Sequence, residues 1–174
     1  MEADRRDSVS SPSPMSFDDL YEAYATDVLR IAYYYLGDRQ QAEDITQDVF
    51  IRFITAHPIL ESGKEKAWLL KVTLNRCRDH WRSAWVRRVV LGHPAFELFP
   101  DRDEISALAG SSDLARAVHD LPPDFKEVVL LHYYQGYDIR EIAEMTQVAE
   151  GTVSSRLSRA RARLKKLLGP EDCE

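Results

Sequence analysis

Between Glu150 and Leu168, apolar residues recur every three or four positions, which predicts a helix that must bury one side against other helices. The apolar stripe consists of Val153, Leu157, Ala160, Leu164 and Leu167. The remaining positions carry hydroxyls near the helix start and six basic residues against one acid, in a chain of net charge −6. A cationic helix on an acidic protein favours contact with a polyanion such as DNA. The alternative is an amphipathic helix that only closes a bundle.

The residues before this segment favour the DNA-binding alternative. A short amphipathic stretch from Asp138 to Met145 is followed by a brief turn, Thr146 to Ala149, and then by the basic helix. A short helix, a tight turn and an exposed polar helix together make a helix-turn-helix, whose second helix enters the major groove.

The rest of the chain predicts an all-α fold of two small helical domains, the C-terminal one being the helix-turn-helix. Only 7 glycines and 8 prolines occur among 174 residues, and long strand-like alternations are absent. We expect a disordered tail over residues 1–15, a first domain over 15–88, a flexible linker over 89–112 and a second domain over 113–169. Within the first domain, helices are expected from Ser16, from Asp38 and over Glu65 to Trp85.

The third of these helices carries a first basic segment. Residues 64–88 contain eight basic residues and two acids, whereas the flanking segments are acidic. Lys71, Asn75, Arg78 and Arg82 are 4, 3 and 4 positions apart and share one face, with Lys64 and Lys66 preceding them. Such a face suits a phosphate backbone and unstacked bases. The alternative is an ordinary charged surface with the tryptophans in the core.

The second helix presents an acidic face that contains one apolar side chain. Its members are Asp44, Gln47, Asp48, Ile51 and Arg52. This face is either inert surface or a small protein-docking patch, and the residues alone do not decide between them.

Other function classes find little support in the sequence. The five histidines are dispersed, and no metal-binding, nucleophile or phosphate-loop spacing occurs, so we expect no enzyme activity, metal or cofactor. Cys77 and Cys173 lie far apart and match no ligand spacing. With no signal peptide and no membrane-spanning run, a cytoplasmic location is expected.

Four motifs in order resemble a known family. They are Ala42-Glu-Asp-Ile-Thr-Gln-Asp-Val-Phe50, Ala67-Trp-Leu-Leu-Lys-Val-Thr-Leu-Asn75, Leu121-Pro-Pro, and Glu141-Ile-Ala-Glu with Gly151-Thr-Val-Ser-Ser-Arg-Leu-Ser-Arg-Ala-Arg161. Together they resemble the bacterial extracytoplasmic-function (ECF) sigma factors, two-domain members of the sigma-70 family. The resemblance covers residues 16–168.

The resemblance implies a function in promoter-specific transcription initiation. The acidic face of the second helix would dock on the clamp helices of the largest subunit of RNA polymerase. The segment from Lys64 to Arg82, Asn75 included, would melt and read the minus-ten element. The last helix would read the minus-thirty-five element of promoter DNA through Thr152, Ser154, Ser155, Arg156, Ser158, Arg159 and Arg163. An anti-sigma factor is the expected further partner.

The chain departs from the family pattern at three places. Gln147 stands in the helix-turn-helix turn where glycine is common, Ser154 replaces a frequent basic residue, and the loop Ala56–Gly63 is peculiar to this chain. We also expect the isolated protein to bind promoters poorly, because its acidic segments repel DNA. A stand-alone helix-turn-helix regulator is the alternative function, and it would bind DNA unaided.

Overall fold

The computed structural model describes residues 15–91 and 113–169, and all regular structure within them is helical, which confirms the predicted fold class. The first domain is a three-helix unit of α1 (Phe17–Leu36), α2 (Arg39–Ala56) and α3 (Glu65–Leu91). The second contains α5 (Asp113–His119), α6 (Pro123–Val129), the π-helical turn η2 (Leu130–Tyr134), α7 (Ile139–Thr146) and α8 (Glu150–Leu168). No described helix is both long and apolar enough to cross a membrane.

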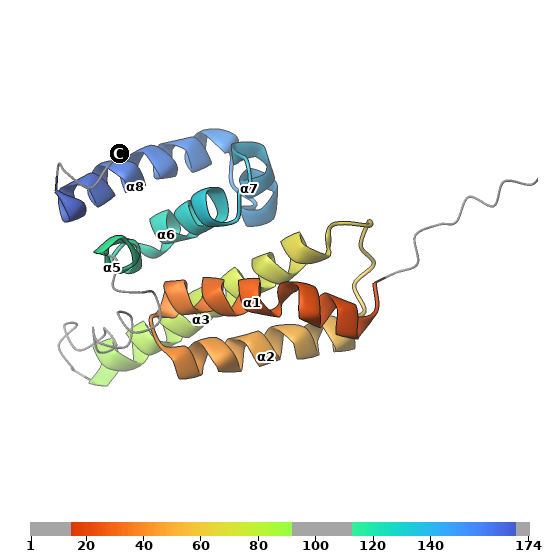
Figure 1. The fold of residues 1–174 in the computed structure, drawn as a ribbon. Helices are drawn as coiled ribbons and strands as arrows, with labels where there is room; N and C mark the ends of the chain where they lie inside the picture. Colours follow the sequence, from red (N-terminus) through yellow and green to blue (C-terminus); the bar gives the residue numbers. More distant parts are fainter. Residues whose placement is uncertain (1–14, 92–112, 170–174) are drawn as a thin grey trace, which may run out of the picture.

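Side-chain caps explain where α1 and α2 begin. Ser16 accepts a hydrogen bond from the backbone N–H of Asp19, and Asp38 accepts one from the backbone N–H of Gln41. Both caps satisfy donors that a helix start leaves without partners. Gly37 ends α1 at a φ of 72°, a left-handed conformation that glycine adopts without steric cost. The two helices therefore reverse direction within two residues and pack side by side (Figure 1).

Helix α3 is longer than its sequence pattern predicts. It runs to Leu91 instead of ending near Trp85, so the first three residues of the expected linker, 89–91, are helical. The remainder of that linker and the expected tail up to residue 14 lie outside the described residues. The buried side of α3 is formed by Leu69, Leu70, Leu74 and Cys77, whereas Trp81 is 39% exposed and so lies outside the core.

In the second domain, α6 lies between α8 and the first domain, and α8 is outermost (Figure 1). The predicted apolar stripe of α8 is buried at Val153, Leu157, Ala160 and Leu164. Leu167, expected in the same stripe, is half exposed near the helix end. The stripe is thus confirmed over three of its turns, and its opposite side is left to solvent.

The two domains pack against each other through α5 and α6 against α1 and through α7 against α3. The rings of Tyr34 in α1 and Tyr134 in η2 meet edge to face with their centroids 5.0 Å apart. Nearby, Lys126 Nζ of α6 donates to the backbone oxygen of Tyr35, 3.0 Å away. These contacts place the second domain over the C-terminal half of α1 and beside α3.

Candidate DNA-binding and protein-docking surfaces

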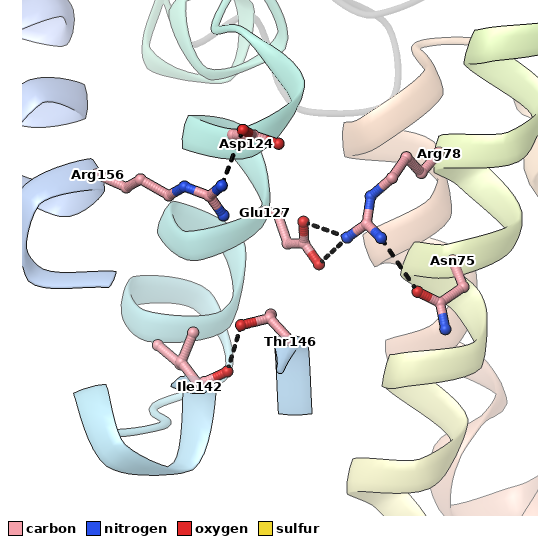
Figure 2. A network of polar contacts seen from close by, with 7 residues as sticks. All are labelled: Asn75, Arg78, Asp124, Glu127, Ile142, Thr146 and Arg156. Atoms are coloured by element: carbon pink, nitrogen blue, oxygen red, sulfur yellow. Dashed lines mark hydrogen bonds and ion pairs between the residues drawn. The ribbon is translucent and has the colours of Figure 1, made fainter. Parts of the chain in front are cut away.

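The outer side of α8 is polar, with serine and threonine side chains near the start of the helix and arginine and lysine side chains further along. Of the residues predicted to read DNA, Thr152, Ser154, Ser155, Ser158, Arg159 and Arg163 are exposed. Arg156 differs from the others because its guanidinium points back to α6, where it donates to Asp124 Oδ2 at 3.0 Å (Figure 2). The structure therefore brings six of the seven predicted residues to one open face, with Arg156 bound at its edge.

A rigid turn holds α8 in this position. Asp138 and Glu141 form a reciprocal capping box at the start of α7, in which each side chain accepts from the other residue's backbone N–H. Thr146 Oγ1 donates to the Ile142 carbonyl at 2.7 Å (Figure 2). Gln147, which stands in the turn where glycine is common, then adopts the left-handed conformation, at φ 58° and ψ 37°. The helix-turn-helix is thus complete, although a non-glycine residue occupies the strained position.

The basic face of α3 is partly covered by the second domain. Asn75 and Arg82 are exposed, Lys71 is half-buried, and Arg78 donates from Nη1 to Asn75 Oδ1 at 3.3 Å. The Arg78 Nη2 atom lies 2.6 Å from both carboxylate oxygens of Glu127 in α6 (Figure 2). Burial alone lowers the pKa of Arg78, but the charge of Glu127 outweighs it and holds the guanidinium pKa above its usual value. Glu127 of α6 therefore pairs with the basic face of α3, a contact that no sequence pattern predicted.

The two lysines ahead of this face lie differently. Lys64 is exposed and precedes α3, whereas Lys66 forms a 3.0 Å ion pair with Asp27 of α1. Lys66 therefore also connects α3 to α1 within the first domain.

The acidic face of α2 carries a larger apolar patch than predicted. Ile51 is 57% exposed, and Ile54, which was not predicted, is 45% exposed one turn further on. Asp44, Gln47 and Arg52 are exposed around them. The spacing of three between the two isoleucines was the available sequence signal, since residues three apart share a helix face.

Asp48 is more constrained than a simple docking carboxylate. Its Oδ2 accepts from Arg52 Nε at 2.9 Å and forms an ion pair with Arg76 Nε of α3 at 2.7 Å. Asp48 therefore links α2 to α3, and Arg76 is a further residue of this surface that the sequence did not indicate.

Among the described residues, no group of three or more His, Cys, Asp or Glu side chains is arranged to hold a metal ion. The Cys77 thiol is buried against α6, and burial raises its pKa far above the usual value. Cys173 lies outside the described residues.

Comparisons with known proteins match both domains. Residues 20–87 match Sigma-70 region 2, and residues 111–164 match Sigma-70, region 4. The chain is 32% identical over 165 residues to the ECF RNA polymerase sigma factor SigE of Mycolicibacterium smegmatis, covering 91% of this chain and 64% of that protein. It is 32% identical over 158 residues to the ECF RNA polymerase sigma factor SigM of Mycobacterium tuberculosis, covering 88% of this chain and 78% of that protein. The chain thus spans just under two thirds of SigE and more than three quarters of SigM.

Two solved structures share the fold. The sigma factor RpoE in complex with the anti-sigma factor NepR from Bartonella quintana aligns with a TM-score of 0.71 at 24% identity, over 89% of this chain and 98% of that one. CnrH in complex with the cytosolic domain of CnrY aligns with a TM-score of 0.67 at 21% identity, over 90% of this chain and 89% of that one. With both domains matched in order and with relatives above 30% identity along most of the chain, the protein belongs to the ECF sigma factors of the sigma-70 family.

Proposed function

We propose that this protein binds core RNA polymerase and directs it to promoters that carry a minus-ten and a minus-thirty-five element. The observation that carries the proposal is the separation of two basic helices onto two domains, with an apolar patch on a third helix. Neither basic surface is large, so each DNA contact is weak alone. Joined in one chain, each contact raises the local concentration of the other, and affinity depends on correct promoter spacing.

The minus-thirty-five element is assigned to α8. Its hydroxyls lie at the N-terminal end, where a recognition helix meets base edges, and Arg159 and Arg163 follow one and two turns later. Lys165 and Lys166 near the C-terminus are exposed and suit phosphate contacts. The exposed face of α8 supports this assignment because no other described element covers it.

The minus-ten element is assigned to the face of α3 that holds Lys71, Asn75, Arg78 and Arg82, with Lys64 and Lys66 at its start. Asparagine offers hydrogen bonds to base edges, while the basic side chains neutralise phosphates. Two of these basic side chains already have protein partners in the structure: Lys66 pairs with Asp27, and Arg78 pairs with Glu127. DNA phosphates must therefore compete with these two carboxylates.

The polymerase-docking surface is assigned to α2, against the clamp helices of the largest subunit. Ile51 and Ile54 supply an apolar centre, and Asp44, Gln47, Asp48 and Arg52 surround it. An apolar centre with a polar rim is the usual anatomy of a protein–protein interface. Because polymerase and chromosome share the bacterial cytoplasm, we place the protein there.

We further propose that an anti-sigma factor controls the protein. Both structural relatives were solved in complexes, RpoE with the anti-sigma factor NepR and CnrH with the cytosolic domain of CnrY. A partner of this kind would act by covering the α2 patch or the basic faces.

The test is run-off transcription with core polymerase on fragments of the source genome. Wild type should initiate at discrete promoters, whereas Ile51→Asp should lose polymerase binding and Arg159→Ala should lose initiation at least tenfold. The matched controls are Leu114→Asp, which changes a residue 52% exposed on α5, and Arg116→Ala on the same helix. Two outcomes would favour a stand-alone regulator instead. Wild type would fail to initiate on any fragment, or it would bind promoter DNA tightly without polymerase and Ile51→Asp would not change that affinity.

A further inference from the structure

The first residue of α8 is an acid on an otherwise basic helix. Between Glu150 and Leu168 the chain carries six basic residues and one acid, which is Glu150 itself. Glu150 is exposed, and its carboxylate has no hydrogen-bond or ion-pair partner within the described part of the chain. Two nearby acids of α7 are engaged, since Glu141 closes the capping box and Glu144 pairs with Arg140. The Glu150 carboxylate is therefore open to a ligand from outside the protein.

Ser154 explains why Glu150 is unpaired. The two residues are four positions apart and so lie on one face of α8, where a glutamate followed by lysine or arginine forms an ion pair. Ser154 replaces a basic residue that is frequent in the family, and its side chain is exposed. A short neutral side chain at this position leaves the carboxylate without a neighbouring cation.

The first two turns of α8 present no exposed basic side chain to DNA. Arg156 is the one basic residue within them, and it donates to Asp124 Oδ2 of α6 at 3.0 Å (Figure 2). The exposed basic residues of α8 begin at Arg159. Phosphate contacts position a protein on DNA, whereas contacts to base edges carry the sequence information. The C-terminal half of α8 thus suits phosphates, and its N-terminal half is left for base edges.

The surroundings of Glu150 leave room for a base. Its neighbour Gly151 is exposed, and a Cβ atom there would meet no neighbouring heavy atom within 4 Å, so packing inside the protein does not require glycine. Glycine within a helix is destabilising relative to alanine, but it allows the backbone to approach a ligand closely. Glu150 also lines a surface hollow between α7 and α8, together with Glu144 and Gln147. The start of α8 can therefore come close to the floor of a groove.

The chemistry of a carboxylate selects the base. An ionised carboxylate only accepts hydrogen bonds, so in the major groove it can pair only with an amino group. The amino groups there are N4 of cytosine and N6 of adenine, whereas guanine and thymine offer acceptors but no donor. Adenine also presents its N7 acceptor beside N6, which repels a carboxylate, and cytosine has no such acceptor. A carboxylate at the start of a recognition helix therefore favours cytosine.

We propose that Glu150 specifies a cytosine at one position of the minus-thirty-five element by accepting a hydrogen bond from the N4 amino group. Ser154 keeps the carboxylate unpaired, and Gly151 lets the backbone of α8 come near the base. This inference rests on the proposed function, because it takes α8 as the helix that reads this element. The competing role for Glu150 is to stabilise the helix start through the helix dipole, which would give no preference for any base.

The first experiment measures run-off transcription by the full chain with core polymerase. The template is a promoter on which wild type initiates, with each base pair of the minus-thirty-five element changed in turn to the three others. Wild type should prefer cytosine at one position by about 5- to 100-fold. Glu150→Ala should remove the preference at that position only. Glu150→Gln should shift it to adenine, because an amide accepts from N6 and donates to N7.

Glu144→Gln is the matched control, because it removes an equal charge from an exposed acid of the same helix-turn-helix and should keep the cytosine preference. Three results would overturn the proposal. Wild type could show no cytosine preference at any position, Glu150→Ala could keep the preference, or Glu150→Ala could lower initiation equally on every template. The last result would assign Glu150 to helix stability.

The second experiment tests the part assigned to Ser154. Ser154→Lys places an ammonium one turn from Glu150, where the two side chains should pair and take the carboxylate from the base. The cytosine preference should then fall at least severalfold on the same templates, and an unchanged preference would overturn this part of the proposal. Wild-type transcription tests the proposed function separately. If wild type initiates while Glu150→Ala keeps every base preference, only the assignment of Glu150 fails.

Discussion

Acidification should destabilise the second domain through one buried histidine. His119, in the last turn of α5, is buried beside α1 and Lys126. Burial, assisted by the Lys126 charge and opposed by the Tyr34 backbone, lowers the pKa of His119 to about 4 from an ordinary value of 6.5. The folded protein thus holds His119 neutral, whereas the unfolded chain takes up a proton as the pH falls below 6.5. The stability contributed by neutral His119 is complete above pH 6.5 and is lost progressively down to pH 4.

The magnitude follows from proton linkage. With these two pKa values, the free energy of unfolding at pH 5.0 should fall by about 2 kcal/mol relative to pH 7.5, and the full loss below pH 4 should be roughly 3 kcal/mol. Urea denaturation followed by circular dichroism at both pH values measures this difference, with m-values compared to confirm a common transition. Carboxylates contribute to acid sensitivity in every variant, so the informative quantity is the difference between variants.

The variant His119→Leu cannot titrate at this position and should lose about 2 kcal/mol less than wild type between pH 7.5 and pH 5.0. His80→Leu, which removes a histidine from α3 in the other domain, should behave like wild type. If His119→Leu shows the same loss as wild type, the neutral buried histidine does not account for the acid response.

Three further changes test the local structure of the second domain. Gln147→Gly should raise the free energy of unfolding by about 1 kcal/mol in a urea melt, because glycine adopts the left-handed conformation without strain; destabilisation would contradict that strain. Asp138→Ala removes the α7 capping box and should cost about 1 kcal/mol by the same measurement, and an unchanged midpoint would mean that the cap contributes nothing. Leu157 is 3% exposed, so Leu157→Ala should lower the free energy of unfolding by about 2–5 kcal/mol, measured by thermal denaturation. Leu167→Ala, at the half-exposed end of α8, should lower it far less. Equal losses would argue against the burial pattern.

Local features of the fold were predictable because they depend on neighbours in the sequence. The caps at Ser16 and Asp38 and the stripe of α8 follow from spacing and side-chain chemistry over one or two turns. The end of α3 was predicted too early. The residues up to Leu91 lose apolar periodicity, but no glycine or proline interrupts the helix before Gly92.

The contacts between the domains were not predictable in this way. Glu127 and Lys126 sit among apolar residues of α6, where charged side chains ordinarily mark the solvent side, and their partners are 49 and 91 positions away. Arg78 was predicted on the basic face, but nothing local indicates that a carboxylate from another domain covers it. The same limit applies to Arg76 and Asp48, which meet only once α2 and α3 are packed.

The π-helical turn η2 affects how this chain is to be compared with its relatives. Its N–H of Gln135 bonds to the Leu130 carbonyl five residues back, so one more residue is accommodated than in an α-helical turn. A relative whose helix runs through this place as regular α-helix would need one residue fewer to aim the same side chain at the first domain. An ungapped alignment would then equate Tyr134 with a position that faces elsewhere. Homologous residues at this contact therefore have to be matched by superposing backbones, and a one-residue gap at η2 would mark a relative that keeps the same contact without the π-helical turn.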